Sequence, residues 1–462
     1  MKILKKVAFR NLGCKVNEYE MEYMQQIMSE NGYEIVPFDT KADIYVVNTC
    51  TVTNIADRKS RQMLHKAKKQ NKDAIVVAAG CYVQTDTENA ARDLAVDIII
   101  GNNNKAKMPQ IIEEYIKSHS MSADSKEIDL WETKRSDYVD DLSKDSDYEE
   151  MSIKNTQEHT RAFIKIQDGC NQFCSYCAIP LARGRIRSRS VDSILEEVTN
   201  LSKSGFKEVV ITGIHLSSYG IDLDNKDNNT KLSYNELAKN GGFTNKRLIE
   251  VISKVAKIEG IKRIRLGSLE PRLITREFVE ALSKIDKICP HFHLSLQSGC
   301  DETLKRMNRK YSASEFKESI RLIREYFELP AITTDVIVGF PQESDEEFEE
   351  TYRFLEEVRF FELHVFKYSK RKGTPAAEMK GQVKDAVKEE RSERLIALDK
   401  KLSCEFVKEY TGRQVEVLFE EEKNGIWLGH TREYIRVGTK GKEDMTNQIV
   451  EATLDGETLF FA

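Results

Sequence analysis

Short apolar segments typical of strands alternate with stretches of helical spacing through most of this 462-residue chain. Strands that alternate with helices favour parallel sheets, because a parallel connection needs a crossover that a helix usually supplies. A chain of this length is also too long for one ordinary domain. We therefore predict an α/β protein with several domains. The strand-like segments of the first hundred or so residues are 7–10, 44–47, 74–78 and 97–100.

Changes in composition and pattern divide the chain into four parts. Residues 1–118 are predicted to form a parallel α/β domain, and residues 119–158, rich in Ser, Asp, Glu and Lys, a linker. Residues 159–385 contain six strand-plus-helix units, which predict a partial or complete (β/α) barrel. Within them, residues 224–245 are predicted to be a surface insertion. Residues 386–462 begin as a charged helix and continue as short strands, which predicts a small antiparallel barrel, a common nucleic-acid-binding shape.

Three cysteines lie close together in the stretch Cys170-Asn-Gln-Phe-Cys174-Ser-Tyr-Cys177, directly after the first strand of the predicted barrel. Thiolates are preferred ligands of iron–sulfur clusters, zinc and copper(I). Four thiols would complete a zinc site or a cubane cluster, and only three are present in this stretch. A cluster on three cysteines leaves one iron open to bind a small molecule. The stretch therefore predicts a reactive cluster at the carboxyl end of a strand.

Three further cysteines occupy equivalent positions, each just after a predicted strand, in the first part of the chain. Cys14, Cys50 and Cys81 each follow a strand-like segment. In an open parallel sheet the loops at the carboxyl ends of the strands converge on the ligand crevice. Any one of these cysteines would most simply be an ordinary buried residue, because cysteine packs as a small hydrophobe. Three in equivalent loops favour a second cluster site, again one ligand short.

Charge and cysteine usage limit the class of protein. The net charge is −5, so nucleic-acid binding would come from local patches, and we expect no DNA partner. No stretch approaches the roughly 18 apolar residues of a membrane span, and the first residues lead directly into a strand. We therefore expect a cytoplasmic protein without a signal peptide or a membrane partner. Nine cysteines in a chain of this size favour ligand, catalytic or core roles over a disulfide framework.

Two predicted helices of the first part differ in character. One carries Met21, Met24 and Met28 at helical spacing, which is typical of core packing. The other, residues 53–72, has seven basic residues against one acidic residue. A charged helix usually presents a solvated face, but its position directly after Cys50 also suits contact with phosphates. Both interpretations remain open at the level of the sequence.

The cysteine-rich stretch and its surroundings, from Arg161 to Gly184, resemble the radical S-adenosylmethionine (SAM) enzymes, and more narrowly the methylthiotransferases. The resemblance covers the whole chain, because the amino-terminal part with its three cysteines also matches. The segment from Gly429 to Val437 is similar to the TRAM domain with which these enzymes hold RNA. Three pieces around the amino-terminal cysteines resemble the subgroup that acts on threonylcarbamoyladenosine in tRNA. They are residues 12–17, 48–53 and 80–84.

The resemblance implies two [4Fe–4S] clusters and SAM as cofactors. Cys170, Cys174 and Cys177 would hold the first cluster, whose open iron binds SAM and, once reduced, cleaves it to a 5′-deoxyadenosyl radical. The second cluster, on the amino-terminal cysteines, would carry or donate sulfur, and a second SAM would supply the methyl group. The implied partners are a reducing electron donor and the anticodon stem-loop of tRNA, in which the adenosine beside the anticodon would be methylthiolated.

Further residues match the family at predicted strand ends. Gly213 ends the pair Thr212-Gly213, where the family contacts the amino group of SAM. Ser268 and Glu270 match a motif near the ribose and amino-acid portion of SAM. Turn formation or packing inside the barrel would explain each of these residues equally well, because glycine and proline are common in turns and loops in any case.

Basic residues beside these motifs are candidates for RNA contact. Four arginines alternate just after the cysteine loop, and in an extended segment they would present one face to tRNA phosphates or to the threonyl carboxylate of the substrate. They are Arg183, Arg185, Arg187 and Arg189. In the terminal barrel, which has more acidic than basic residues, Arg432 and Arg436 would form only a narrow basic strip.

These observations favour a two-cluster radical enzyme that methylthiolates threonylcarbamoyladenosine in tRNA. One alternative keeps the chemistry and changes the target to isopentenyladenosine in tRNA or to a ribosomal protein. Another alternative, of a different class, is a noncatalytic iron–sulfur module for RNA binding or electron transfer. Sites with three rather than four cysteines count against pure electron transfer, which needs no open iron.

Overall fold

The computed structural model of the chain describes residues 5–121, 138–143, 146–154, 160–239, 242–441, 443–457 and 459–461. These residues form two compact units that alternate along the sequence. The amino-terminal unit comprises Met1–Asn155, Gln167–Arg189 and Ser369–Ala377. The carboxyl-terminal unit comprises Thr156–Ile166, Ser190–Tyr368 and Glu378–Ala462. No helix in the described ranges is long and apolar enough to cross a membrane.

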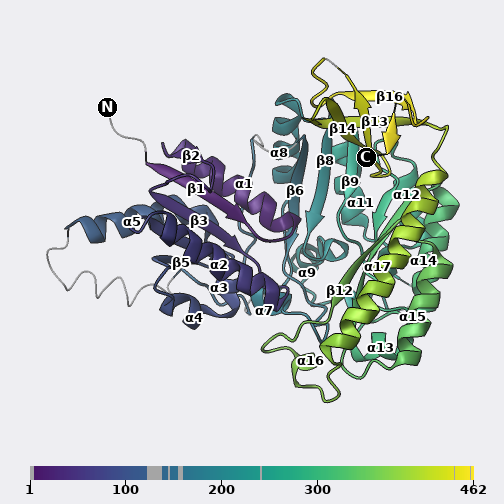
Figure 1. Cartoon of the computed structure of the whole chain (residues 1–462), viewed down its shortest axis with the longest axis horizontal. Coiled ribbons are helices and arrows are strands. Elements are labelled where there is room, and N and C mark those ends of the chain that lie inside the picture. The colour runs from purple at the N-terminus through teal and green to yellow at the C-terminus, as the bar shows by residue number, and fades with distance from the viewer. Residues whose placement is uncertain are drawn as a thin grey trace. The chain divides into compact units, whose positions relative to one another are not determined.

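The amino-terminal unit is built on a five-stranded parallel sheet of order β2-β1-β3-β4-β5 (Figure 1). Its strands are β1 (Lys6–Asn11), β2 (Glu34–Val36), β3 (Ile44–Thr49), β4 (Ile75–Gly80) and β5 (Ile98–Ile100). Its helices are α1 (Lys15–Glu30), α2 (Asn54–Gln70), α3 (Cys81–Thr85), α4 (Thr87–Arg92) and α5 (Met108–Met121). The strand order reverses direction between β1 and β3, which is the position where open α/β sheets bind their ligands.

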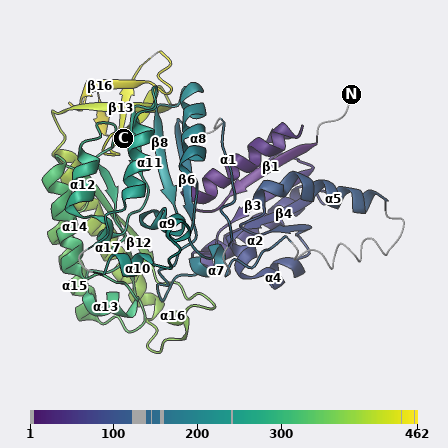
Figure 2. The ribbon, with the colours of Figure 1, turned by 180° about the vertical axis from the view of Figure 1, so that it is seen from behind.

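Helices cover both faces of this sheet, because successive side chains of a buried strand point to opposite faces. One core contains the methionines of α1, such as Met24, together with Met108 and Ile112 of α5 and alternate residues of the strands. The other core contains Leu64 of α2, Val83 of α3 and the intervening strand residues. The two views in Figures 1 and 2 show this sheet between its helical layers. The parallel α/β prediction for this part is confirmed.

Two segments that are distant in sequence complete the amino-terminal unit. The first, Gln167–Arg189, contains the end of β6 (Arg161–Asp168), α7 (Ile179–Arg183) and β7 (Arg187–Ser188), with β7 antiparallel to the end of β6. The second is Ser369–Ala377.

Parts of the predicted linker are packed in this unit. Tyr19 donates a hydrogen bond to the Met151 carbonyl at 2.7 Å, and Ile153 is fully buried. The remainder of residues 119–158, which includes 122–137, 144–145 and 155–158, lies outside the described residues.

The carboxyl-terminal unit contains a curved parallel sheet whose strands follow one another in sequence. Strands β6, β8 and β9 are neighbours, as are β10, β11 and β12. Isolated parallel bridges from Ile264 to Ile288 and from Leu269 to Leu294 join the two groups. Within the described residues no pairing returns from β12 to β6, so the strands form an open, partial barrel. The later strands are β8 (Glu208–Gly213), β9 (Arg263–Leu266), β10 (His291–His293), β11 (Ala331–Val338) and β12 (Glu362–Lys367).

Amphipathic helices alternate with these strands, as the sequence predicts. Three of the longer ones begin at serine or asparagine caps whose side chains accept a backbone N–H, namely Ser190, Asn245 and Ser344. The helices are α8 (Val191–Lys203), α9 (Ile221–Asn228), α10 (Tyr234–Leu237), α11 (Lys246–Ala256), α12 (Arg276–Ser283), α13 (Asp301–Arg306), α14 (Ala313–Tyr326), α15 (Asp345–Val358) and α16 (Pro375–Glu378).

The predicted surface insertion at residues 224–245 is partly buried. Tyr234, on α10, is 1% exposed and donates a hydrogen bond to the Glu270 carboxylate at 2.7 Å. Asn245 donates to the Ser217 and Tyr219 carbonyls at 3.1 and 2.8 Å. The polar composition of this segment concealed its contacts, because its buried polar groups are hydrogen-bonded inside the fold.

The last part of the chain is a long helix followed by an antiparallel sheet. Helix α17 (Asp385–Lys408) leads into five strands of order β16-β13-β14-β15-β17. The strands are β13 (Gln414–Lys423), β14 (Ile426–Thr431), β15 (Arg436–Lys440), β16 (Ile449–Thr453) and β17 (Phe460–Phe461). Their inner face packs around Val417, Phe419 and Val437. The predicted antiparallel architecture is confirmed.

Candidate functional site

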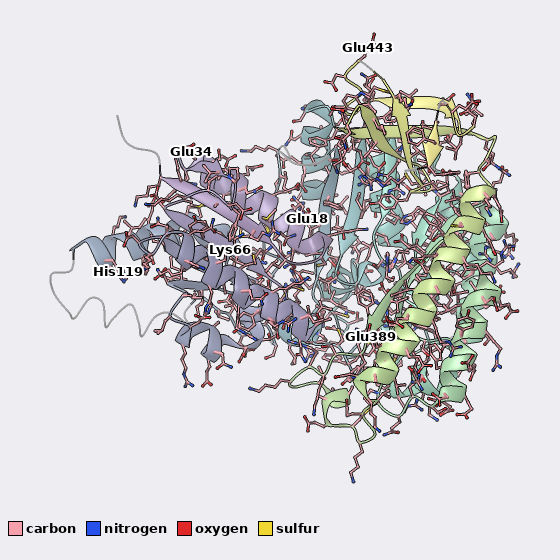
Figure 3. The ribbon with its side chains drawn as sticks, viewed as in Figure 1. Glu18, Glu34, Lys66, His119, Glu389 and Glu443 are labelled. Atoms are coloured by element: carbon pink, nitrogen blue, oxygen red, sulfur yellow. The ribbon has the colours of Figure 1, made fainter. Side chains whose placement is uncertain are left out.

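The three amino-terminal cysteines lie at the carboxyl ends of three adjacent strands. Cys14 is the N-cap of α1, whose first turn carries Glu18 (Figure 3), and it follows β1. Cys50 directly follows β3, and Cys81 directly follows β4 as the first residue of α3. Because β1, β3 and β4 are neighbours in the sheet and parallel, their carboxyl ends meet at one edge.

The backbone before Cys81 can accommodate only glycine. Gly80 has φ of +99°, a conformation that side chains rarely adopt. A Cβ at this position would also lie 2.7 Å from the Asn48 side chain and 2.9 Å from the Thr49 carbonyl. The sharp turn therefore brings the Cys81 thiol directly to the edge of the sheet.

The three thiols influence one another electrostatically. Burial, together with the neighbouring Cys81 and Cys14 thiols, raises the pKa of Cys50 to about 12. Cys50 and Cys81 are buried, whereas Cys14 is exposed. Among the residues that the structure describes, no group of three His, Cys, Asp or Glu converges on a point that would hold a single metal ion. A cubane cluster does not need such convergence, because each thiolate binds a different iron.

A buried guanidinium group lies beside these cysteines. Arg183 is fully buried and donates to Glu20 at 2.7 Å and to Asn17 at 2.7 Å. It also donates to the Asp168 carboxylate at 3.1 and 3.2 Å. The Cys14 thiol donates to the same Asn17 oxygen at 3.7 Å. Arg183 thus connects the first cysteine of one set to the segment that carries the second set.

A second link runs through an amide side chain. Asn102 donates from Nδ2 to the Cys81 sulfur at 3.5 Å and to the Ala182 carbonyl at 2.7 Å. Its oxygen accepts from Lys105 at 3.0 Å, and Lys105 also pairs with Glu20. Hydrogen bonds to ligand sulfurs and buried charges are two of the means by which proteins tune iron–sulfur clusters. Three thiols, a sulfur-directed amide and a buried cation are therefore a donor set that fits an anionic cluster.

The second cysteine set occupies a tight loop between β6 and α7. The Cys170 amide donates to the Gly184 carbonyl at 3.0 Å, and the Cys177 amide donates to the Cys174 carbonyl at 3.0 Å. Cys174 is buried, and Cys170 and Cys177 are partly exposed. Phe173 is 46% exposed, and the Arg185 guanidinium lies 4.8 Å from its ring centroid. Backbone hydrogen bonds therefore help to hold the loop that carries these three cysteines.

A segment near the end of the barrel, which the sequence analysis did not identify, contacts both cysteine loops. Arg371, which is 7% exposed, donates to Asn54 at 2.6 Å, to Thr51 at 2.7 Å and to Asp57 at 2.5 Å. These three residues follow Cys50 in the chain. The Ala376 amide donates to the Ser175 carbonyl inside the other cysteine loop at 2.8 Å. We call Ser369–Ala377 the bridging segment.

The prediction that four alternating arginines present one basic face is wrong. Arg183 lies at the end of α7 rather than in an extended segment, and it is buried with its carboxylate partners. Arg187 pairs with Asp168, and Arg189 pairs with Glu150 and is fully buried. Only Arg185 is partly exposed. Arg183 and Arg187 are held by the buried carboxylates of Glu20 and Asp168, and Arg189 is itself buried, so these three arginines are not available to an RNA backbone.

The residues predicted to contact SAM lie in the carboxyl-terminal unit. Gly213 is the last residue of β8, and Ser268 and Glu270 follow β9, with Ser268 exposed. The Glu270 carboxylate is 5% exposed and accepts hydrogen bonds from Tyr234 at 2.7 Å and Arg272 at 2.8 Å. Glu270 thus orders its own strand end, and Tyr234 and Arg272 are polar neighbours that sequence patterns did not identify.

The basic strip predicted in the terminal sheet is reduced to one residue. Arg432 donates to the Ile288 carbonyl at 2.8 Å and to the Asp286 carbonyl. Arg436 remains about half exposed, with the Glu421 carboxylate 3.6 Å away. Arg432 therefore attaches the sheet to the barrel instead of facing solvent.

Two family models match the chain. A model described as "Radical SAM superfamily" matches residues 164–355. A model described as "Uncharacterized protein family UPF0004" matches residues 6–101. The second match covers the parallel sheet that carries Cys14, Cys50 and Cys81, and the first match covers the other cysteine loop.

Curated relatives match over nearly the whole chain. The threonylcarbamoyladenosine tRNA methylthiotransferase MtaB of Bacillus subtilis is 41% identical over 453 residues, which cover 97% of this chain and 93% of the relative. The MtaB of Aquifex aeolicus is 37% identical, covering 95% and 98%. The tRNA-2-methylthio-N(6)-dimethylallyladenosine synthase of Pelotomaculum thermopropionicum is 34% identical, covering 99% and 96%.

One solved structure is similar to this chain in its fold. The radical S-adenosylmethionine methyltransferase TsrM of Kitasatospora setae aligns with a TM-score of 0.51 at 14% identity. The alignment covers 81% of this chain and 77% of that chain. At this identity the two proteins share an architecture.

Proposed function

Because the chain belongs to the radical SAM tRNA methylthiotransferases, we propose that it converts N6-threonylcarbamoyladenosine beside the anticodon of tRNA to its 2-methylthio derivative. The observation that carries this choice of substrate is the 41% identity, over 97% of the chain, with a relative that bears this name. Relatives named for dimethylallyladenosine match at 34% or a similar value. The pieces around Cys14, Cys50 and Cys81 resemble the same subgroup.

The proposal assigns a [4Fe–4S] cluster to each cysteine set. Cys170, Cys174 and Cys177 would hold the cluster that binds SAM, and Cys14, Cys50 and Cys81 would hold the cluster that carries or donates sulfur. With SAM, such clusters supply the radical chemistry that an inert aromatic C–H bond requires. The three-thiol composition of each set supports the assignment, because it leaves one iron open.

In this proposal the side chains around the sulfurs hold the two loops in position. Arg183 compensates buried charge beside Cys14, and Asn102 donates a hydrogen bond to the Cys81 sulfur. Arg371 fixes the loop that follows Cys50. Each of these groups is buried, so each interaction acts at low dielectric, where it is stronger than in water.

The remaining assignments concern cofactor and RNA contacts. Gly213, Ser268 and Glu270 would face SAM from the strand ends of the barrel. The antiparallel sheet at the end of the chain would act as a TRAM-like RNA-binding domain. A reducing partner would supply electrons.

The proposal is tested by mass spectrometry of tRNA nucleosides from a strain that lacks the gene. We expect 2-methylthio-threonylcarbamoyladenosine to be lost and threonylcarbamoyladenosine to accumulate, and wild-type protein to reverse both changes. Cys14→Ala and Cys177→Ala should fail to restore the product. Cys404→Ala is the matched control, because Cys404 is exposed and belongs to neither set. Unchanged product in the deletion strain, with no redundant enzyme, would refute the substrate.

Relatives named for dimethylallyladenosine make that nucleoside the second candidate substrate. The same measurement separates the two, because loss of the methylthio group from isopentenyladenosine instead of threonylcarbamoyladenosine would identify it. Purified reduced protein should also form 5′-deoxyadenosine from SAM. An intact two-cluster protein that forms none would contradict any radical activity.

A further inference from the structure

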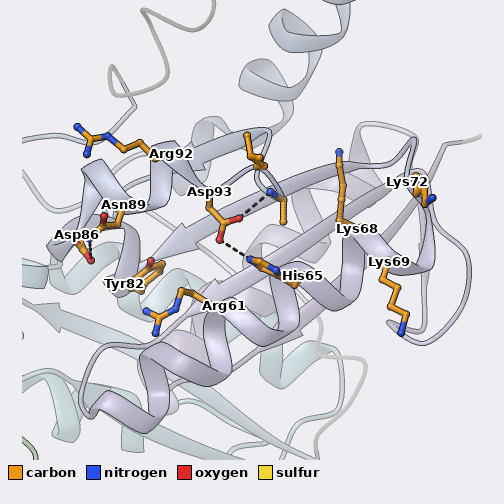
Figure 4. Close-up of a pocket in the computed structure, with 12 residues that line it drawn as sticks. Arg61, His65, Lys68, Lys69, Lys72, Tyr82, Asp86, Asn89, Arg92 and Asp93 are labelled. Atoms are coloured by element: carbon orange, nitrogen blue, oxygen red, sulfur yellow. Dashed lines mark hydrogen bonds and ion pairs between the residues drawn. The ribbon is translucent and has the colours of Figure 1, made fainter.

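The amino-terminal unit carries a basic groove on the face of the sheet opposite α1. The groove, of about 900 Å³, lies between α2 and α4 and the residues that follow each helix (Figure 4). Helix α2 packs on the sheet through Ser60, Leu64 and Ala67 and turns its other face to the groove. The basic and acidic residues that line the groove are Arg61, His65, Lys68, Lys69, Lys72, Asp86, Arg92 and Asp93, and His65 is charged only when it is protonated.

The basic residues of α2 recur at helical spacing. Positions 61, 65, 68 and 69 lie on one face, because residues three and four apart are neighbours on a helix surface. From Arg61 to Lys69 the row extends about 12 Å along the helix axis. Lys72 continues the row just past the end of the helix, and Arg92 of α4 also lines the groove. The row is therefore long enough to follow a charged polymer.

Some of these cations are neutralised within the protein and others are not. His65 pairs with Asp93 at 3.0 Å, and Lys68 pairs with Asp97 at 2.7 Å. Outside the groove, Lys66 of the same helix (Figure 3) pairs with Asp39 at 2.6 Å.

Three further lining residues have no carboxylate within salt-bridge distance in the part of the chain that the structure describes. They are Lys69, Lys72 and Arg92, and all three are exposed. The guanidinium of Arg61 lies 5.7 Å from the ring centroid of Tyr82. The net excess of cations faces solvent along a shallow, open groove, where the like charges add up to a positive potential.

We propose that this groove, formed by α2 and α4, binds the phosphodiester backbone of the substrate tRNA. The inference rests on the proposed function for the identity of the RNA, and on the groove for the contact. Phosphate contacts position a nucleic acid without reading its sequence, and lysine and arginine are the usual donors. An RNA strand offers a continuous row of negative charges that matches the row of cations. Three of the four arginines near the cysteine loop are buried, so this groove offers the proposed RNA contact that they do not.

The test is the salt dependence of tRNA binding by a variant that lacks the three unpaired cations. The variant is Lys69→Gln, Lys72→Gln and Arg92→Gln, and the probe is unmodified tRNA transcript that carries a fluorophore. Each lost phosphate contact lowers the slope of log K against log salt by about 0.7 to 0.9. We expect a slope smaller by about two and an affinity weaker by about tenfold or more at moderate salt.

A matched control removes the same charge elsewhere in the unit. Lys5→Gln, Lys41→Gln and Lys117→Gln change three exposed lysines that do not line the groove. This control should keep the slope of the wild type. Iron content and the thermal unfolding midpoint show whether each variant is folded and loaded.

The outcomes separate the groove from the proposed function. If the groove variant has the slope and affinity of the wild type, or of the control variant, the groove proposal is overturned and the proposed function is unaffected. If the groove variant loses slope but the deletion strain keeps its methylthio nucleoside, RNA binding at the groove stands and the proposed substrate fails.

Discussion

At the scale of single residues, the least expected feature is the depth at which charges are buried beside the cysteines. Arg183, Glu20 and Lys105 are all fully buried, and Asp168 nearly so. Such groups are costly to desolvate and persist only when they are paired and hydrogen-bonded. No pattern in the sequence predicted this network, because Arg183 and Glu20 are 163 positions apart. A repeat of arginines indicates charge and does not say where its partners lie.

Removing the guanidinium of Arg183 should destabilise the amino-terminal unit strongly. Arg183→Met removes one buried cation from Glu20 and from Asp168, which keep their pairs with Lys105 and Arg187, and breaking a buried ion pair typically costs about 3–5 kcal/mol. The free energy of unfolding in denaturant measures this loss. Arg185→Met is the control, because Arg185 is partly exposed and its Nε donates only to the Ser143 carbonyl at 3.3 Å. Equal losses in the two variants would show that the network carries no special stability.

At the scale of secondary-structure elements, the bridging segment matters most. It contacts the loop after Cys50 through Arg371 and the other cysteine loop through the Ala376 amide. The sequence predicted both α1 and α2, and for α1 the apolar residues recur at a local spacing that one window can reveal. The bridging segment escaped prediction for the opposite reason. Arg371 and Thr51 are separated by 320 positions.

Arg371→Gln should weaken the binding of the cluster that we propose on Cys14, Cys50 and Cys81. The substitution removes the ion pair with Asp57. It also replaces the guanidinium that donates hydrogen bonds to Thr51 and Asn54 with a shorter side chain. In a background that lacks the cysteines of the barrel loop, we expect less iron per chain and faster loss of the remaining iron to a chelator.

The neighbouring substitution Lys370→Gln provides the comparison, because Lys370 is exposed. Iron content and chelation rates that match this control would contradict a positioning role for Arg371. The iron content of the full-length Arg371→Gln protein, with all nine cysteines present, is also measured to check that the substitution does not prevent folding.

At the scale of the whole molecule, buried arginines join the terminal antiparallel sheet to the barrel within the carboxyl-terminal unit. Arg263 donates to the Glu416 carboxylate at 2.7 Å and to the His430 carbonyl at 3.0 Å. Arg265 donates to the Glu208 carboxylate and to the Arg432 carbonyl, both at 2.9 Å. The sequence predicted both sheets from their strand patterns, but the side chains that join them lie inside strands and resemble ordinary strand residues.

The stability of this junction should depend on pH through Glu208. Burial alone raises the pKa of this carboxyl group, but Arg265, Arg161 and Arg263 hold it below its usual range. A lowered folded-state pKa contributes stability that is complete above the unfolded-state pKa of about 4.3 and is lost as pH falls through the folded-state pKa.

Glu208→Gln should therefore lower the thermal unfolding midpoint at neutral pH and reduce its dependence on pH below about 4. The free energy of unfolding at neutral pH should fall by about 3–5 kcal/mol, because two arginines lose a buried partner. Glu416→Gln is the control, because the Glu416 side chain is 29% exposed. If the unfolding midpoint depends on pH in the same way in Glu208→Gln and in the wild type, this carboxylate is not responsible for the loss of stability in acid.

The three-part composition of the amino-terminal unit has a consequence for the order in which the protein is made. Chains fold from the amino terminus during synthesis, and a domain usually completes itself once its last residue has emerged from the ribosome. Here the last residue is Ala377, about four-fifths of the way along 462 residues. Arg183 emerges about two-fifths of the way along the chain, but until Ser369–Ala377 has been made the nascent sheet lacks Arg371, which holds the loop after Cys50. Insertion of the cluster proposed for the amino-terminal unit is therefore expected only after about four-fifths of the chain has been translated.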